Sequence, residues 1–184
     1  MRSIIISIFI LISLLIGTAG HSQTNLSSTN KKMNTKKQVF ARLLFTALQK
    51  NDEALWLSLY PTDEEYKSLL QLMLVAKMDG LTQQKIDQMI GQRKKEASAL
   101  YRKEFHELQA EAKKKGISLV NTTYQSFDSE AIYPTNFPKK YLNGDIWLAG
   151  KNGYYLIAGI EAVETENGYK LQAIGGIREV EESN

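Results

Sequence analysis

The first half of the chain, from about residue 38 to about residue 115, carries apolar residues at intervals of three and four positions. This spacing places apolar side chains on one face of a helix, so it predicts amphipathic helices. The first run ends near Asn51, and its apolar positions are Val39, Phe40, Leu43, Leu44, Ala47 and Leu48. The pattern predicts that a helical layer forms before any sheet.

Local signals divide this half into further helices. A short helix over 52–61 ends at Pro61, because proline lacks an amide hydrogen and disfavours a helical conformation in the residue before it. Thr62 and Glu65 have the spacing of a capping box, which predicts that a new helix begins there. A long helix follows over 82–115, and lysines and a glycine mark its end.

After residue 116 the apolar period changes to two, which is typical of strands. Segment 117–127 is rich in β-branched and aromatic residues and predicts the first strand. Three later strands are predicted over 145–150, 154–163 and 169–180, and two Asn-Gly pairs between them suit two-residue hairpin turns. Strict alternation in the middle strand predicts one shared face for Tyr154, Leu156, Ala158, Ile160 and Ala162.

Helices first and strands second predict the α+β class. We expect N-terminal helices over about 38–115 to pack on a C-terminal antiparallel β-meander over about 117–180. The length suits a single domain over 37–184. Whether the helix over 82–115 packs on the sheet or projects from it is left open by the pattern.

The N-terminus has the three parts of a signal peptide over residues 1–22. Arg2 precedes an apolar run from Ile4 to Gly17, and small residues follow at Thr18, Gly20 and Ser22. The run is shorter than the roughly 20 apolar residues of a spanning helix, so a retained membrane anchor is the weaker interpretation. We expect an exported protein, periplasmic or secreted, with a disordered polar linker over 23–36.

Composition excludes several kinds of chemistry. The chain has no cysteine, so it has no disulfide scaffold, thiol nucleophile or thiolate metal site. The net charge is +3 and no helix face is basic throughout, which argues against a nucleic-acid partner. We expect no cofactor, no metal and, once the leader is removed, no stable membrane span.

The order of helices before a curled meander resembles the cystatin-like and NTF2-like α+β superfold of small exported proteins. The resemblance rests on the topology of residues 38–180 and on the meander sequence DIWLAGKNGYYLIAGIEAVETENGYKLQAIGGI. No active-site motif of the superfold is matched. The helical half is also longer than one sheet-covering helix requires, and the superfold includes both enzymes and binding modules.

Candidate catalytic groups are few. His106 lies within the predicted long helix, where a solvated histidine is the simpler interpretation, and His21 lies in the leader. Asp145 and Glu161 fall on neighbouring predicted strands, where burial would allow a carboxylate to act as a general base. Tyr155 is the third candidate. The sequence leaves open whether the chain is an enzyme and favours a protein without catalytic activity.

Aromatic residues gather in the meander and in the long connection over 131–141. Trp147 and Tyr155 would line a ligand site on the sheet, or they stabilise the sheet by cross-strand packing. The connection has two interpretations. It is a recognition loop anchored by Tyr133, Phe137 and Tyr141, or it only covers the open end of the sheet.

The sequence therefore favours a non-catalytic binding module for a protein or a small apolar ligand. Its predicted surface is the exposed sheet face with the connection over 131–141. One alternative is an NTF2-like enzyme that uses a pocket carboxylate or tyrosine for acid–base chemistry. Another is a subunit that docks on a partner through the helix over 82–115, since charges of both signs alternate along it.

Overall fold

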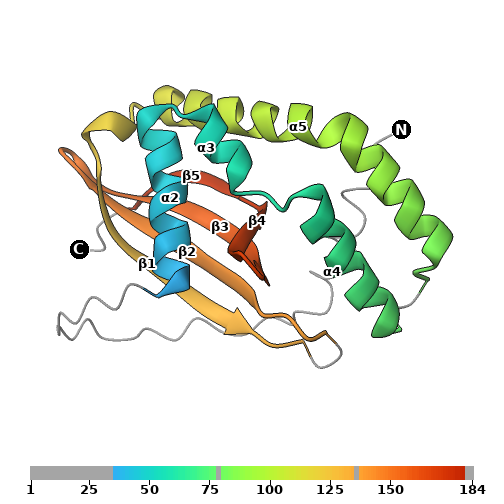
Figure 1. Cartoon of the computed structure of the whole chain (residues 1–184). Coiled ribbons are helices and arrows are strands. Elements are labelled where there is room, and N and C mark those ends of the chain that lie inside the picture. The colour runs from blue at the N-terminus through green and yellow to red at the C-terminus, as the bar shows by residue number, and fades with distance from the viewer. Residues whose placement is uncertain (1–34, 78–79, 135–136, 181–184) are drawn as a thin grey trace. The chain divides into compact units, whose positions relative to one another are not determined.

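The structure is a computed structural model that describes residues 35–77, 80–134 and 137–180. These belong to one compact unit, residues 34–184. The elements, labelled as in Figure 1, are α2 (Lys36–Lys50), α3 (Glu53–Ser58), α4 (Asp63–Val75), α5 (Gln83–Lys114), η1 (Leu119–Asn121), β1 (Thr123–Ile132), β2 (Tyr141–Gly150), β3 (Gly153–Thr165), β4 (Gly168–Ala173) and β5 (Gly176–Val180). The predicted α+β class is confirmed.

The predicted leader over 1–22 and nearly all of the predicted linker over 23–36 lie outside the described residues. The linker was predicted slightly too long, because Lys36 is already the first residue of α2. Thr35 is the N-cap of this helix and accepts a hydrogen bond from the Gln38 amide.

The other helices also begin at a side-chain cap. Asp52 accepts the Leu55 amide at 2.9 Å, and Thr82 accepts the Lys85 amide at 3.3 Å. The predicted capping box at the start of α4 is confirmed, because the Glu65 amide donates to the Thr62 hydroxyl and the Thr62 amide donates to the Glu65 carboxylate. Each α-helix therefore begins where a polar side chain accepts a hydrogen bond from one of its free amides.

The five strands form one antiparallel sheet in the order β1–β2–β3–β4, and β5 also pairs with β3. β4 and β5 pair with different parts of β3, and both lie on the side of β3 away from β2. The single strand predicted over 169–180 is therefore wrong. The chain breaks around Gly175, which packs closely against the backbone of Ala158 and Gly159.

The first strand begins later than predicted. Over 117–122 the chain forms a turn that contains η1 rather than the start of a strand, and Ile117 and Leu119 are buried there. The Thr122 hydroxyl donates to the Leu119 carbonyl at 2.8 Å and stabilises this turn. The alternating apolar residues here therefore belong to a tight turn and not to a strand. β1 continues to Ile132 and β2 begins at Tyr141, so the connection between these two strands is 133–140.

A bulge in β3 changes which side chains face the helices. β3 carries one residue more than β2 between two of the pairs that join them, and Gly159 adopts a φ of 64° there. Tyr155 and Ile157 are buried before the bulge, and Ile160 and Ala162 after it. The predicted alternation is therefore wrong for the first half of the strand, because an inserted residue exchanges the two faces.

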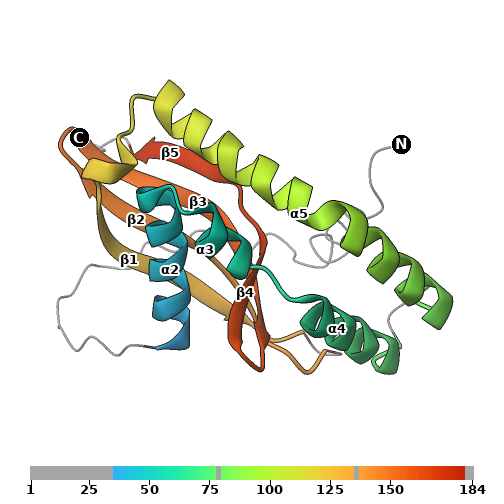
Figure 2. The same cartoon turned by 45° about the horizontal axis from the view of Figure 1, so that its top comes forward.

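The helices form a layer on one face of the sheet. α2, α3 and the C-terminal half of α5 lie over this face (Figure 2). α4 packs against the N-terminal half of α5, and both extend beyond the sheet. We call α4 with residues 83–97 the helical hairpin. The sequence left open whether the helix over 82–115 packs on the sheet or projects from it. In the structure its C-terminal half packs on the sheet and its N-terminal half projects.

Candidate functional site

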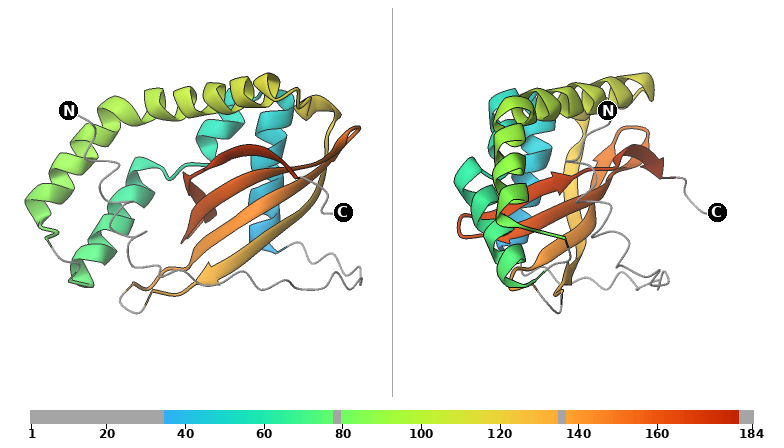
Figure 3. Two further views of the ribbon diagram at one scale, coloured as in Figure 1. Left: turned by 180° about the vertical axis from the view of Figure 1, so that it is seen from behind. Right: turned by 90° about the vertical axis from the view of Figure 1, so that its right-hand side faces the viewer.

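The strands direct one set of side chains away from the helices, onto a surface that we call the outer face. These side chains alternate with the buried residues of β1, β2 and β3. They include Ser126, Asp128, Glu130, Asn143, Asp145, Trp147, Tyr154, Leu156 and Glu161. No helix of the described residues lies on this face (Figure 3). Within the described part of the chain, the outer face is the side of the sheet that is open to a partner.

Trp147 and Leu156 form the apolar centre of the outer face. They are directly paired across β2 and β3, with Ser126 of β1 and Arg178 of β5 at the ends of the same row. Both are partly exposed, and Tyr154 in the next row is 46% exposed. Aromatic and aliphatic side chains surrounded by polar ones are typical of a protein interaction surface.

Asp145 has a structural partner on the outer face. Its carboxylate accepts a hydrogen bond of 2.8 Å from the amide of Gly159, at the bulge of β3. An amide at a bulge lacks its regular ladder partner, so the carboxylate satisfies it. Asp145 therefore has a structural role at the bulge, because its carboxylate is the partner of the Gly159 amide.

The three catalytic candidates are divided between the two faces of the sheet, because only Glu161 shares the outer face with Asp145. Glu161 lies on the outer face, where partial burial raises the pKa of its carboxyl. Tyr155 is 6% exposed and belongs to the core beneath the helices, on the opposite face of the sheet. The structure therefore places the predicted acid–base residues on two sides of the sheet rather than around one pocket.

The loop over 133–140 combines an anchor with an exposed aromatic ring. Phe137 is 8% exposed and packs against Tyr141, with ring centroids 5.5 Å apart. Burial raises the pKa of Tyr141 to about 12. Tyr133 is 67% exposed, and the Lys140 ammonium lies 5.4 Å from its ring centroid. Phe137 and Tyr141 therefore hold the loop, whereas Tyr133 is accessible to a ligand.

His106 lies on the exposed surface of α5. Its Nε2 atom is 3.0 Å from the Glu53 carboxylate, which Arg102 also contacts at 3.0 Å. In residues 35–77, 80–134 and 137–180, no group of three or more His, Cys, Asp or Glu side chains is placed to hold a metal ion. None of the helices described in these ranges is long and apolar enough to cross a bilayer.

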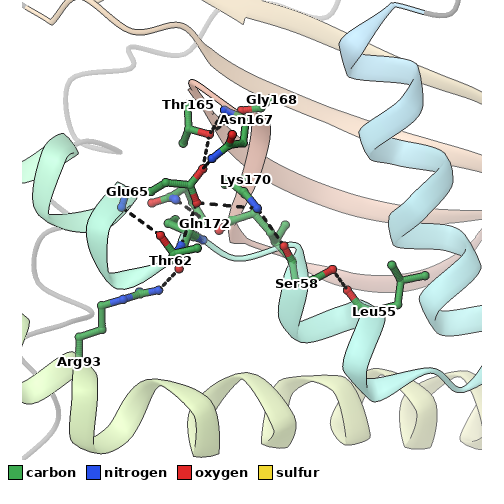
Figure 4. Close-up of polar contacts among 12 residues, drawn as sticks. Leu55, Ser58, Thr62, Glu65, Arg93, Thr165, Asn167, Gly168, Lys170 and Gln172 are labelled. Atoms are coloured by element: carbon green, nitrogen blue, oxygen red, sulfur yellow. Dashed lines mark hydrogen bonds and ion pairs between the residues drawn. The ribbon is translucent and has the colours of Figure 1, made fainter.

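Glu65 is the centre of a polar cluster that joins α4 to the β3–β4 hairpin (Figure 4). Its carboxylate accepts hydrogen bonds from the Thr165 hydroxyl at 2.8 Å, the Asn167 amide at 3.0 Å and the Thr62 backbone amide at 2.9 Å. Lys170 lies 3.8 Å away. Burial alone would raise the pKa of Glu65, but these hydrogen bonds and the Lys170 charge together lower it. Glu65 is therefore held in its charged form.

Arg93 is a buried cation in the helical hairpin, with 8% exposure. Its Nε atom donates to the Asp63 carboxylate at 3.2 Å, Nη1 donates to the Tyr101 hydroxyl at 2.6 Å, and Nη2 donates to the Pro61 carbonyl. The guanidinium also lies 4.6 Å from the Tyr66 ring centroid. Arg93 thus connects α5 to the start of α4.

A chain of aromatic and polar contacts continues from Arg93 to α3. The rings of Tyr60 and Tyr101 are stacked, with centroids 3.6 Å apart, and the Trp56 indole donates to the Tyr101 carbonyl at 2.9 Å. The Tyr60 hydroxyl donates to Glu104. Burial raises the pKa of both Glu104 and Tyr60. This cluster joins α3, α5 and the helical hairpin.

Sequence reasoning missed both polar clusters. It identified Glu65 as a capping residue, but Thr165 and Asn167 lie 100 and 102 positions further along the chain. For Arg93 a signal was present. It lies four residues after Met89 and four before Ala97, in a row of α5 that is otherwise apolar, and a charge in such a row needs a buried partner.

Comparisons of the chain with protein-family models, with curated proteins and with solved structures found no match.

Proposed function

We propose that the chain is a non-catalytic binding module whose outer face holds a protein or a small apolar ligand. The observation that supports this is the Trp147–Leu156 pair, which is partly exposed on a sheet face that no described helix covers. Tyr133 adds an exposed ring from the neighbouring loop. An aromatic centre with a polar rim is the usual arrangement of binding energy in an interface.

Two alternatives each have one supporting observation. For acid–base catalysis it is Glu161, whose raised pKa would suit a general base. The separation of Tyr155 from the two carboxylates counts against a shared pocket. For docking through the helix over 82–115 the supporting observation is Leu100, which is 41% exposed on α5.

We further propose that the protein is exported and belongs to the cystatin-like and NTF2-like superfold. The basic and apolar N-terminus supports export. The helical layer before an antiparallel sheet supports the superfold, while the helical hairpin is an addition to its usual plan. Cell fractionation with mass measurement tests the first point: we expect a shortened protein outside the cytoplasm, and full-mass protein confined to the cytoplasm would contradict export.

The binding proposal is tested with two probes and the full chain. Peptides selected from a random library represent a protein partner, and anilinonaphthalene sulfonate represents a small apolar ligand. Trp147→Ala removes the centre of the outer face and should weaken whichever probe binds by about 30-fold, as loss of an interface hot spot does. The matched control Leu100→Ser, on α5, should leave binding unchanged.

Circular dichroism of both variants excludes a loss of fold. If Leu100→Ser abolishes binding and Trp147→Ala does not, the outer-face proposal is wrong and docking through α5 is favoured. If neither probe binds the wild-type chain, the proposal fails as well.

A further inference from the structure

At the edge of the sheet formed by β4 and β5, backbone groups form hydrogen bonds with the helical layer. In β5 the Ile177 amide donates to the Glu111 carboxylate at 3.2 Å, and its carbonyl accepts from the Lys115 ammonium. In β4 the Leu171 amide donates to the Leu59 carbonyl at 2.7 Å. Side chains and backbone from α5 and the end of α3 therefore close this edge against a further strand.

The opposite edge, formed by β1, is closed over its first half. The Gln49 side-chain amide donates to the Thr122 carbonyl at 2.9 Å, just before the strand, and that of Gln38 donates to the Phe127 carbonyl at 3.3 Å. Tyr124 also binds Gln38 through its hydroxyl. The side of α2 thus covers β1 as far as Phe127.

The second half of β1, Asp128–Ile132, differs from the other three edge segments. The Phe127 carbonyl points away from β2, and backbone groups alternate in an antiparallel strand, so those of Ser129 and Ala131 also point outward. Apart from the ladder with β2, no backbone hydrogen bond joins this stretch to another described residue. We call it the open edge.

The open edge has a charge pattern as well as backbone groups that lack a partner among the described residues. Asp128 and Glu130 are exposed and belong to the outer face, whereas Ser129 and Ala131 point towards the helix side. A strand added here would place every second side chain directly beside the two carboxylates, where opposite charges attract. The side chains between them would meet only the small residues Ser129 and Ala131.

From this arrangement we propose that the open edge binds an extended segment of a partner protein with Lys or Arg at every second position. The partner would extend the sheet by one strand, so backbone hydrogen bonds would give affinity and the alternating cations would give selectivity. A second copy of the chain fits less well, because pairing two β1 strands would bring Asp128 and Glu130 beside the same acids. The open edge also lacks the Lys and Pro that commonly protect free edges.

This inference does not depend on the proposed role of Trp147 and Leu156. It concerns the backbone at the margin of the sheet rather than the apolar centre of the outer face. Binding at the two places is separable by mutation, because Trp147 lies in the row of Ser126, before the open edge begins.

The test uses a fluorescent peptide of alternating lysine and valine with the full chain, measured by anisotropy. Its matched control is the same peptide N-methylated at the amides that would donate to the edge, which keeps all side chains and charges. We expect the parent peptide to bind and the methylated one not to bind. A peptide with glutamate in place of lysine should also fail to bind. Hydrogen exchange of the Ser129 and Ala131 amides should slow in the complex.

Two variants complete the test. The double variant Asp128→Asn with Glu130→Gln removes both charges and should weaken binding by about fivefold, the effect of two lost cross-strand charge pairs. Ala131→Pro removes an outward amide from the open edge and should abolish binding, while Trp147→Ala should leave it within about twofold. Circular dichroism checks that each variant is folded. The N-methylated peptide tests the backbone hydrogen bonds independently, because it leaves the protein unchanged.

Three outcomes would overturn the inference. Equal binding of the methylated and parent peptides would show charge attraction without strand addition. Loss of binding in Trp147→Ala but not in the edge variants would place the peptide on the apolar centre of the outer face. A peptide-independent dimer that slows exchange at Ser129 and Ala131 would make a second copy the occupant.

Discussion

The sheet with its covering helices and the helical hairpin are stabilised in different ways. The first region has a continuous core with fully buried aromatic and aliphatic side chains, including Trp56, Phe105 and Ile157. The hairpin buries a smaller set outside that core, including Ile86 and Leu70. It depends on polar contacts at its base, where Arg93 and Glu65 bind their partners. Burial therefore holds the first region together, whereas a few polar residues fix the position of the second.

The largest expected effect is in the core. Phe105→Ala removes a fully buried ring and should lower the free energy of unfolding by about 3 to 5 kcal/mol. Urea unfolding monitored by circular dichroism measures this loss. Ile86→Ala in the hairpin is the matched comparison. It should speed hydrogen exchange within residues 63–97 and change the global midpoint less. Equal global losses in the two variants would show that the regions unfold as one.

The second effect concerns Arg93. Arg93→Met keeps much of the apolar stem but leaves Asp63, the Pro61 carbonyl and the Tyr101 hydroxyl without their donor. Since these groups lose a buried charged partner, we expect a loss of about 2 kcal/mol, concentrated in the hairpin. Native-state hydrogen exchange of α4 measures it. A variant that exchanges like the wild type would show that apolar packing alone positions the hairpin.

The third effect is a pH dependence centred on Glu65. Its pKa is lower in the folded chain, so the stability that it contributes is present above the pKa of the unfolded chain and is lost as pH falls through the folded value. Glu65→Gln should therefore cost about 1 to 2 kcal/mol at neutral pH and less in acid. Unfolding of both proteins at several pH values measures the difference. A constant difference between them would contradict the charged role of Glu65.

The smallest effect has the opposite sign. Burial raises the pKa of Glu104, so its contribution to stability is present at low pH and is lost as pH rises through the folded value. Glu104→Gln retains an acceptor for the Tyr60 hydroxyl and removes the buried charge, so it should raise the melting temperature slightly at neutral pH. Calorimetry at neutral and acid pH tests this. A lower melting temperature at neutral pH would show that the charge of Glu104 is stabilising.

Sequence patterns predicted the features of the fold that depend on residues close together in the chain. The Thr62 and Glu65 capping box, the short helix before Pro61, which ends earlier than predicted at Ser58, and the change of period after residue 116 each depend on a few neighbouring residues. They place helices before strands, which is the confirmed class. Features that depend on distant partners were not accessible from these patterns.

The errors have specific physical causes. The bulge at Gly159 is one inserted residue with a left-handed backbone, and a single glycine in a strand does not reveal on its own that the faces will exchange. Ile117 and Leu119 alternate as in a strand but are buried in a turn. For the candidate site, the sequence suggested the aromatic residues but not their faces. Tyr155 is therefore found in the core, and Trp147 on the outer face.

The sheet separates the two tryptophans of the chain into different environments. Trp56 is completely buried and its indole is hydrogen-bonded, whereas Trp147 is partly exposed on the other side. Their fluorescence should therefore consist of a component that acrylamide does not reach and a component that it quenches. Replacing Trp147 by Phe would leave an emission that reports unfolding of the core alone, and replacing Trp56 by Phe would leave an emission sensitive to ligands. The native chain thus carries a separate intrinsic fluorophore for each process.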